Sequence, residues 1–220
     1  MIKFFWEFPL SLCTTLFLFF FYISVNLTLT HPKIATYFYS YPGKFSLINW
    51  ILSSFYHSTY SHLFSNMFFL YFLGRAAESK ISKGKWILFY LSAGVISMMF
   101  DSIFRGFILQ ERAPAVGASG AISGIAAVAM VYSPLQYRVF GINFVFPVFI
   151  IAWLMIYSDF MNMFSSDNVA HFAHLAGFFS ILVTSYLLSE KDREKLRVNF
   201  SLNALFFIFT VILIFFLENR

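Results

Sequence analysis

The chain has 220 residues, of which 60% are hydrophobic and only 11% are charged. Soluble domains carry roughly 25% charged residues, so this composition excludes an ordinary soluble protein and indicates one embedded in a lipid bilayer. The formal net charge of +5 does not indicate a nucleic-acid partner. The basic residues fall in short loops between apolar runs, where the positive-inside rule already accounts for them.

The apolar runs, taken in chain order, predict seven membrane-spanning helices. A mixed polar and aromatic segment follows the first run, and its stretch Phe45–Tyr56 is expected to form a helix in the membrane interface. The expected fold is all-α: a polytopic membrane helix bundle with a six-span core over residues 1–190, then a charged linker and a seventh span over residues 191–220. The expected spans are Pro9–Leu29, Ser61–Ala77, Trp86–Phe107, Gly117–Tyr132, Phe140–Phe164, Ala170–Leu188 and Leu202–Leu217.

The fourth expected span is too short to cross a bilayer completely. It runs from Gly117 to Tyr132, 16 residues or about 24 Å at 1.5 Å per residue. The hydrocarbon core is roughly 30 Å thick, so this helix is expected to begin below the membrane surface, in a cavity. Ten of the 15 basic residues fall on the side of the N-terminus, which predicts that this side is cytoplasmic. The second, fourth and sixth spans then all begin on the opposite side.

Polar residues gather where these three spans begin. His62 and Asn66 lie at the start of the second span, Ser119 at the start of the fourth and His174 at the start of the sixth. Ionisable residues inside membrane spans are costly and by default mark function. Because the four residues share one depth and one side of the membrane, we expect them to form a site.

Ser119 and His174 suit nucleophilic catalysis. A serine hydroxyl is a weak nucleophile until a base within hydrogen-bond reach takes its proton, and histidine is such a base. Ser119 is also expected on the first turn of a helix, where unpaired backbone N–H groups can hold a developing oxyanion. No acidic residue lies near either residue in the sequence, so the hypothesis is a Ser-His dyad.

Small residues around this pair predict close helix packing. Gly117 and Gly120 let a substrate backbone approach the serine between them. Gly120 with Gly124, and Ala173 with Gly177, place small residues four positions apart on the fourth and sixth spans. Such faces allow two membrane helices to approach closely, which would bring the serine and the histidine together.

Asn66 follows His62 by four residues, so both lie on one helix face and could donate hydrogen bonds to the same oxyanion. Each polar residue alone could be ordinary helix packing or interhelical hydrogen bonding. A metal or haem site is a further alternative, because His57, His62, His171 and His174 lie at one depth. No His-Glu-x-x-His motif supports a zinc protease, so we expect no metal and no cofactor. His57 and His171 are interpreted as structural or gating residues.

Three blocks of this sequence resemble the rhomboid family of intramembrane serine proteases. They occur in the family's order and spacing, over about Asn49 to Leu188. The blocks are His57-x4-His62-x3-Asn66 followed by Gly74-x3-Glu78, then Gly117-Ala118-Ser119-Gly120-Ala121-Ile122-Ser123-Gly124, and then Ala173-His174-Leu175-Ala176-Gly177.

This resemblance implies a rhomboid-like six-helix core with one helix added after it. It implies that Ser119 is the nucleophile, that His174 is the base, and that His62 and Asn66 help to form the oxyanion hole. The implied function is a serine endopeptidase that cleaves single-pass transmembrane proteins near helix-destabilising residues. The alternative is a catalytically inactive rhomboid-like protein that binds membrane clients, although such proteins usually lack the serine or the histidine, and both are present here.

The sequence departs from the family pattern in two places. Many members carry Trp-Arg in the first long loop, where this sequence reads Ile48-Asn49, which leaves open how the loop is anchored and what Glu78 contacts. Some members carry an aromatic residue that stacks on the catalytic histidine, four positions after the serine. Here that residue is Ser123, so the imidazole must be held in another way.

Two further expectations concern location and access. The phenylalanine-rich composition and the lack of extra domains favour a multi-pass protein of a prokaryotic plasma membrane. A gate for the substrate helix is expected at the fifth span and the loop Ser165–Asn168. Trp153 and Phe160 are expected to pack against the second span and to keep this gate closed.

Overall fold

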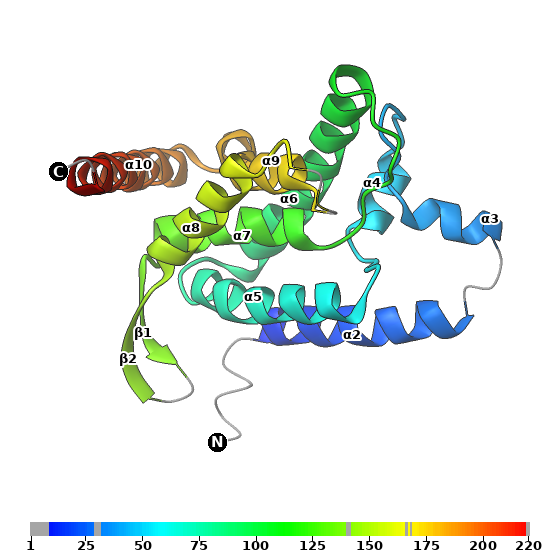
Figure 1. The fold of residues 1–220 in the computed structure, drawn as a ribbon. Coiled ribbons are helices and arrows are strands. Elements are labelled where there is room, and N and C mark those ends of the chain that lie inside the picture. Colours follow the sequence, from blue (N-terminus) through cyan, green and yellow to red (C-terminus); the bar gives the residue numbers. More distant parts are fainter. Residues whose placement is uncertain (1–8, 29–31, 140–141, 166, 168, 219–220) are drawn as a thin grey trace.

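The computed structural model of this protein describes residues 9–28, 32–139, 142–165, 167 and 169–218, and they form a bundle of helices (Figure 1). The predicted all-α bundle is confirmed, with one short hairpin as a local departure. The elements are α2 (Pro9–Thr28), α3 (Pro32–Ala35), η1 (Thr36–Phe38), α4 (Leu47–Ser53), α5 (Tyr60–Glu78), α6 (Lys83–Ile103), η2 (Phe104–Ile108), α7 (Ser119–Tyr132), β1 (Leu135–Val139), β2 (Ile142–Pro147), α8 (Val148–Met161), α9 (His171–Thr184), η3 (Ser185–Leu187) and α10 (Glu190–Glu218).

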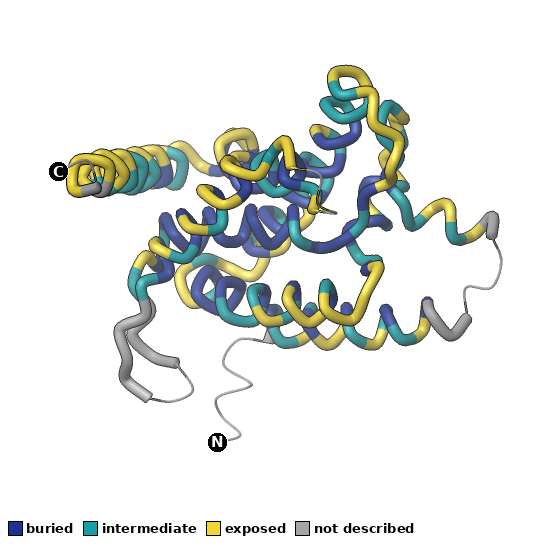
Figure 2. The backbone as a smooth tube through the Cα atoms, in the orientation of Figure 1, coloured by how far each residue is buried: buried dark blue, intermediate teal, exposed yellow. Residues whose placement is uncertain are grey.

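Helix α7 forms the centre of the bundle. Its residues from Gly120 to Val131 are all buried, and Figure 2 shows the helix almost entirely in dark blue. Helices α5, α6, α8 and α9 pack around it. A Cβ atom added at Gly177 of α9 would collide with the carbonyl oxygen of Gly120, and one added at Gly124 would collide with Ala93 of α6. Glycines therefore set the distance between α7 and both neighbours.

The fifth predicted span begins too early. Phe140 lies outside the described residues, but β1 and β2 pair antiparallel, and α8 begins only at Val148. Alternating β-branched and aromatic residues in β2 favour a strand over a helix. Pro147 has no backbone N–H to donate, so it suits the end of the ladder and the position just before a helix.

The predicted charged linker is helical. Residues Glu190–Arg197 form the first turns of α10 and continue without a break into the predicted seventh span. Glu, Lys and Arg are good helix formers, and the hydroxyl of Ser189 accepts a hydrogen bond from the N–H of Asp192 at 3.3 Å. The Asp192 carboxylate also pairs with Lys85 at the start of α6, at 2.8 Å.

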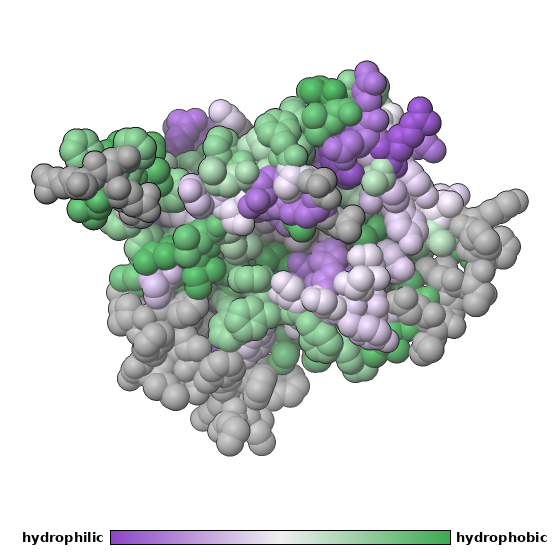
Figure 3. Space-filling view, in the orientation of Figure 1, coloured by the Kyte–Doolittle hydropathy of each residue, from purple (hydrophilic) through white to green (hydrophobic). Residues whose placement is uncertain are grey.

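The outside of the bundle is largely apolar. In Figure 3 hydrophobic residues cover α8 and α10, and hydrophilic residues gather near the start of α9. Among the described residues, two helices are long and apolar enough to cross a membrane, Lys83–Ile108 and Glu190–Leu217. The apolar window of the second is not buried at all, a surface that a soluble monomer rarely exposes. Four shorter apolar helices accompany them: Leu10–Val25, Ser119–Tyr132, Val148–Met161 and His171–Leu187.

Glu78, at the end of α5, holds the start of α2. Its carboxylate accepts hydrogen bonds from the backbone N–H groups of Leu10 and Ser11, both at 3.0 Å, and from the Ser11 hydroxyl at 2.8 Å. N–H groups in the first turn of a helix have no intrahelical acceptor, and a negative charge is favourable there. Glu78 therefore caps α2.

Asn49 holds the first long loop, at one of the two positions where the expected Trp-Arg is missing. Its side-chain amide donates to the carbonyl oxygens of Thr36 and Tyr39, both at 2.8 Å. Backbone hydrogen bonds in both directions then join Ser40 to Ala115, in the segment that leads to α7. The loop is thus anchored by an amide side chain and by backbone pairing.

Candidate active site

Helices α5, α7 and α9 begin at the same end of the bundle (Figure 1). Ser119 is the first residue of α7, and His174 lies in the first turn of α9. Nε2 of His174 lies 2.7 Å from Oγ of Ser119, although 55 residues separate the two along the chain. This is a hydrogen-bond distance, across which a proton can pass between the two side chains.

Gly117 makes the turn that presents Ser119. Its φ of +126° lies outside the helical region, so α7 begins at Ser119 and not at Gly117 as predicted. A side chain here would be strained, and its Cβ would lie only 2.6 Å from Cε1 of His62. Because Ser119 opens the helix, its own N–H and the next ones have no intrahelical acceptor. These groups are available to an oxyanion.

His62 and Asn66 lie beside this turn. The Cβ position at Gly117 is 2.7 Å from Nε2 of His62 and 3.7 Å from Nδ2 of Asn66. Asn66 is 5% exposed, and among the described residues its Nδ2 finds no hydrogen-bond acceptor. A buried donor without an acceptor costs roughly 1–3 kcal/mol. The amide is therefore free to bind the oxygen of a ligand placed at Ser119.

An acidic residue that sequence reasoning missed lies on the other side of the histidine. Oδ1 of Asp159, in α8, is 2.8 Å from Nδ1 of His174, and the Asp159 side chain is 9% exposed. The two residues are 15 positions apart, and an acidic residue inside an apolar run was the signal that could have revealed it. Ser123 is buried in α7, and the hydrogen bond to Asp159 holds the imidazole through its Nδ1 atom.

Asp159 has a second histidine partner. Nδ1 of His171 lies 2.7 Å from the same Oδ1 atom, and Nε2 of His171 lies 3.1 Å from Oδ1 of Asp167. Ligand atoms of Asp159, His171 and His174 lie within 4.8 Å of one another, so these residues could hold a metal ion. The separations of 2.7 and 2.8 Å are those of hydrogen bonds, whereas neighbouring ligand atoms around tetrahedral zinc are about 3.3 Å apart. The observed geometry is that of a hydrogen-bonded cluster.

His57 contacts the ring of His62. It is fully buried, and its ring packs edge-on against the ring of His62 with 5.1 Å between the centroids. Burial, and secondarily the charge of His62, lower the pKa of His57 to about 3, so its ring is neutral at physiological pH. These contacts fit the interpretation of His57 as a structural residue.

The packing expected of Trp153 differs from its observed aromatic contacts. The ring of Trp153 stacks on Phe207 of α10 with 4.4 Å between centroids and lies 5.6 Å from Phe178 of α9. The aromatic contacts of Trp153 are thus with α9 and α10, whereas the sequence predicted packing against α5, the second span. Phe160 is 60% exposed, and within the predicted gate loop Ser166 and Asn168 lie outside the described residues.

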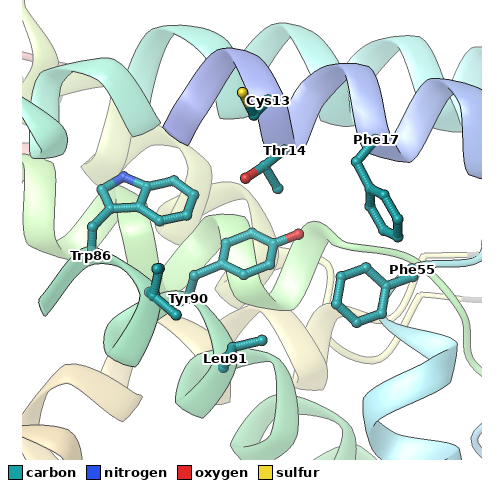
Figure 4. A pocket seen from close by; sticks show the side chains of 8 residues that line it. Cys13, Thr14, Phe17, Phe55, Trp86, Tyr90 and Leu91 are labelled. Carbon is teal, nitrogen blue, oxygen red and sulfur yellow. The ribbon is translucent and has the colours of Figure 1, made fainter. Parts of the chain in front are cut away.

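A pocket of about 280 Å³ lies between α2 and α6 (Figure 4). Its lining is apolar and aromatic and includes Phe17, Phe55 and Tyr90. None of the candidate site residues lines it, and its lining holds no histidine or acidic residue that could act as a base for Cys13 or Thr14.

Comparisons with known proteins converge on one family. A model of the Rhomboid domain matches residues 44–191, which include all the candidate site residues. The chain is 28% identical to "Rhomboid-like protein 11, chloroplastic" of Arabidopsis thaliana over 163 residues, 70% of this chain and 55% of that protein. It is 32% identical to "Presenilin-associated rhomboid-like protein A, mitochondrial" of Danio rerio over 95 residues, 43% of this chain and 24% of that protein. It is 31% identical to a mitochondrial presenilin-associated rhomboid-like protein of Rattus norvegicus over 98 residues, 44% of this chain and 26% of that protein.

These relatives correct one expectation. They carry chloroplastic and mitochondrial labels, which point to an organellar membrane and contradict the predicted prokaryotic plasma membrane with its cytoplasmic N-terminus. The prediction rested on phenylalanine-rich composition and the lack of extra domains; an apolar composition indicates that a chain crosses a bilayer but does not identify the bilayer, and that is why the prediction failed. The chain spans about half the length of the first relative and a quarter of the other two.

Proposed function

This chain belongs to the Rhomboid family, and we propose that it is an intramembrane serine endopeptidase. The observation that carries the proposal is the 2.7 Å contact between Oγ of Ser119 and Nε2 of His174. A nucleophile and a base at this distance, at the start of a helix buried in the bundle, have the arrangement that covalent catalysis requires.

The reaction proceeds by acyl transfer. Oγ of Ser119 attacks the carbonyl carbon of the scissile peptide bond while its proton moves to Nε2 of His174, and the electron pair of the carbonyl moves to its oxygen. His174 then gives the proton to the amide nitrogen, the C–N bond breaks, and an ester remains on Ser119. Water repeats the attack with His174 as base, and the serine is released.

The oxyanion formed in each attack is bound by donors beside Ser119. The N–H of Ser119 is one, the side-chain amide of Asn66 is the second, and a ring N–H of His62 is the third. The lack of an acceptor for Asn66 in the described structure supports this assignment. A donor that is already in place costs little reorganisation when the charge develops.

Rhomboid-family proteins act on transmembrane substrates within the bilayer, and we infer single-pass transmembrane proteins as the substrate class here. A protease must bind its peptide in an extended form, so a helix weakened by glycine or proline near the cleavage point is the easier substrate.

A catalytically inactive, client-binding protein is the rival function, and the names of the relatives state no protease activity. The two are separated by labelling the detergent-solubilised chain with a fluorescent fluorophosphonate. The protease forms a covalent adduct that Ser119→Ala abolishes, and an inactive binder forms none. Absence of labelling in folded wild-type protein overturns the proposed function.

We further propose that α10 crosses the membrane as a seventh helix, after the six-span core. Its length and its unburied apolar surface support this. Reporter domains fused to the two ends of the chain should then lie on opposite sides of the organellar membrane; reporters on the same side would contradict it.

A further inference from the structure

Asp159 lies at the candidate site, but neither of the proposed proton transfers through His174 uses it. Its carboxylate lies 2.8 Å from Nδ1 of His174, on the edge of the ring opposite Ser119, and is 9% exposed. A buried carboxylate is costly unless hydrogen bonds satisfy it. The hydrogen bond to His174 therefore helps to keep Asp159 in place. The same hydrogen bond helps to keep the His174 ring in place.

The contacts of His174 with Asp159 and Ser119 select one tautomer of its imidazole ring. A neutral histidine carries one N–H, on either Nδ1 or Nε2. Ionised Asp159 can only accept a hydrogen bond, so the short contact requires the proton on Nδ1. Nε2 is then unprotonated and faces the Ser119 hydroxyl at 2.7 Å. Only this tautomer can take the proton of the serine.

A second hydrogen bond, from His171, fixes the position of the Asp159 carboxylate. His171 bonds the same Oδ1 atom at 2.7 Å from the start of α9, so two histidines of one helix turn share it. Among the described residues, Asp159 is the hydrogen-bond partner of Nδ1 of His174.

We propose that Asp159 is a positioning residue that holds His174 in the Nδ1–H tautomer, so that this chain works with an Asp-His-Ser chain of hydrogen bonds. This inference rests on the proposed function and goes beyond the two-residue dyad. After Ser119 gives up its proton, Asp159 also faces the imidazolium and stabilises its charge.

The test compares Asp159→Asn with Asp167→Asn in the detergent-solubilised chain of 220 residues. Both substitutions remove one carboxylate charge near the same cluster, but Asp167 bonds His171 and is 45% exposed. Saturation kinetics of fluorophosphonate labelling separate the maximal labelling rate from the apparent affinity of the probe. We expect Asp159→Asn to lower the maximal rate about 10²–10⁴-fold, as loss of the orienting carboxylate does in a serine protease triad. The probe affinity should change less than about threefold, and Asp167→Asn should label within about threefold of wild type.

A second readout reports the tautomer itself. ¹⁵N spectra of histidine-labelled protein distinguish Nδ1–H from Nε2–H rings, and the signals of His174 are those lost in His174→Ala. We expect Nδ1–H in the wild type and a shift towards Nε2–H in Asp159→Asn. A purely structural role would lower the melting temperature without this shift.

The outcomes are distinct. Wild-type labelling in Asp159→Asn, an equal loss in Asp167→Asn, or an unchanged His174 tautomer overturns the positioning role. Failure of the wild type to label overturns the proposed function instead, and the histidine spectra still decide whether Asp159 sets the tautomer.

Discussion

Nε2 of His174 meets Oγ of Ser119 at 2.7 Å because two glycines allow α7 and α9 to touch. Gly177 faces the carbonyl oxygen of Gly120 with no room for a methyl group between them. The same contact that packs the core thus fixes the distance between the proposed nucleophile and its base.

Removing either member of this pair should abolish cleavage. Ser119→Ala and His174→Ala each remove half of a unit that works only when complete, so the double variant should be little worse than either single one. Initial rates on a reporter protein with one transmembrane helix, measured beside the melting temperature, test this. Substantial cleavage by a folded single variant would falsify the pairing.

Asn66→Ala and His62→Ala should give slow enzymes that still react with fluorophosphonate. Removing one oxyanion donor typically costs about 10²–10³ in rate, whereas nucleophile and base remain. The measurement pairs the cleavage rate with the melting temperature of each variant. If Asn66→Ala melts normally and cleaves at the wild-type rate, Asn66 has no place in the oxyanion hole.

Glu78→Gln should destabilise the bundle without changing the reactivity of Ser119. Hydrogen bonds to a charged group contribute about 1.5–3 kcal/mol, and Glu78 accepts three from the start of α2. We expect unfolding to become easier by roughly 2 kcal/mol. Ser11→Ala removes only one of the three hydrogen bonds and should cost less.

Labelling per folded molecule should stay within about threefold of wild type in both variants, because neither residue contacts Ser119 or His174 in the described structure. A melting temperature unchanged by Glu78→Gln would show that the cap of α2 contributes nothing to stability.

Gly177→Ala should separate Ser119 from His174. The added methyl collides with the backbone of Gly120, and overpacking of this kind typically costs about 1–3 kcal/mol. Labelling should fall at least about tenfold, because the proton transfer depends steeply on distance.

Gly84→Ala, in the first turn of α6, is the matched control. Nothing lies within 4 Å of the added atom, and alanine is the better helix former by roughly 1 kcal/mol. Stability should stay or rise, and labelling should not change. Equal losses in the two variants would mean that the α7–α9 contact does not control the site.

Local sequence determined much of this protein. The apolar runs indicate the helices that form the bundle, because about 20 apolar residues suit a bilayer and glycines mark close helix contacts. The start of α7 near Gly117 and the face shared by His62 and Asn66 follow from backbone preference and helix periodicity. Those rules act within a few residues, so they can be read from the chain.

Contacts between distant segments were decided only by the tertiary structure. Asp159 meets His174, and Glu78 meets Ser11, through packing between different helices. Trp153 faces α9 and α10 because the rotation of α8 is set by its neighbours and not by its own composition. Around Trp153 the residues of α8 are all apolar and mark no face of the helix, so the partners of Trp153 are fixed only when the whole bundle assembles.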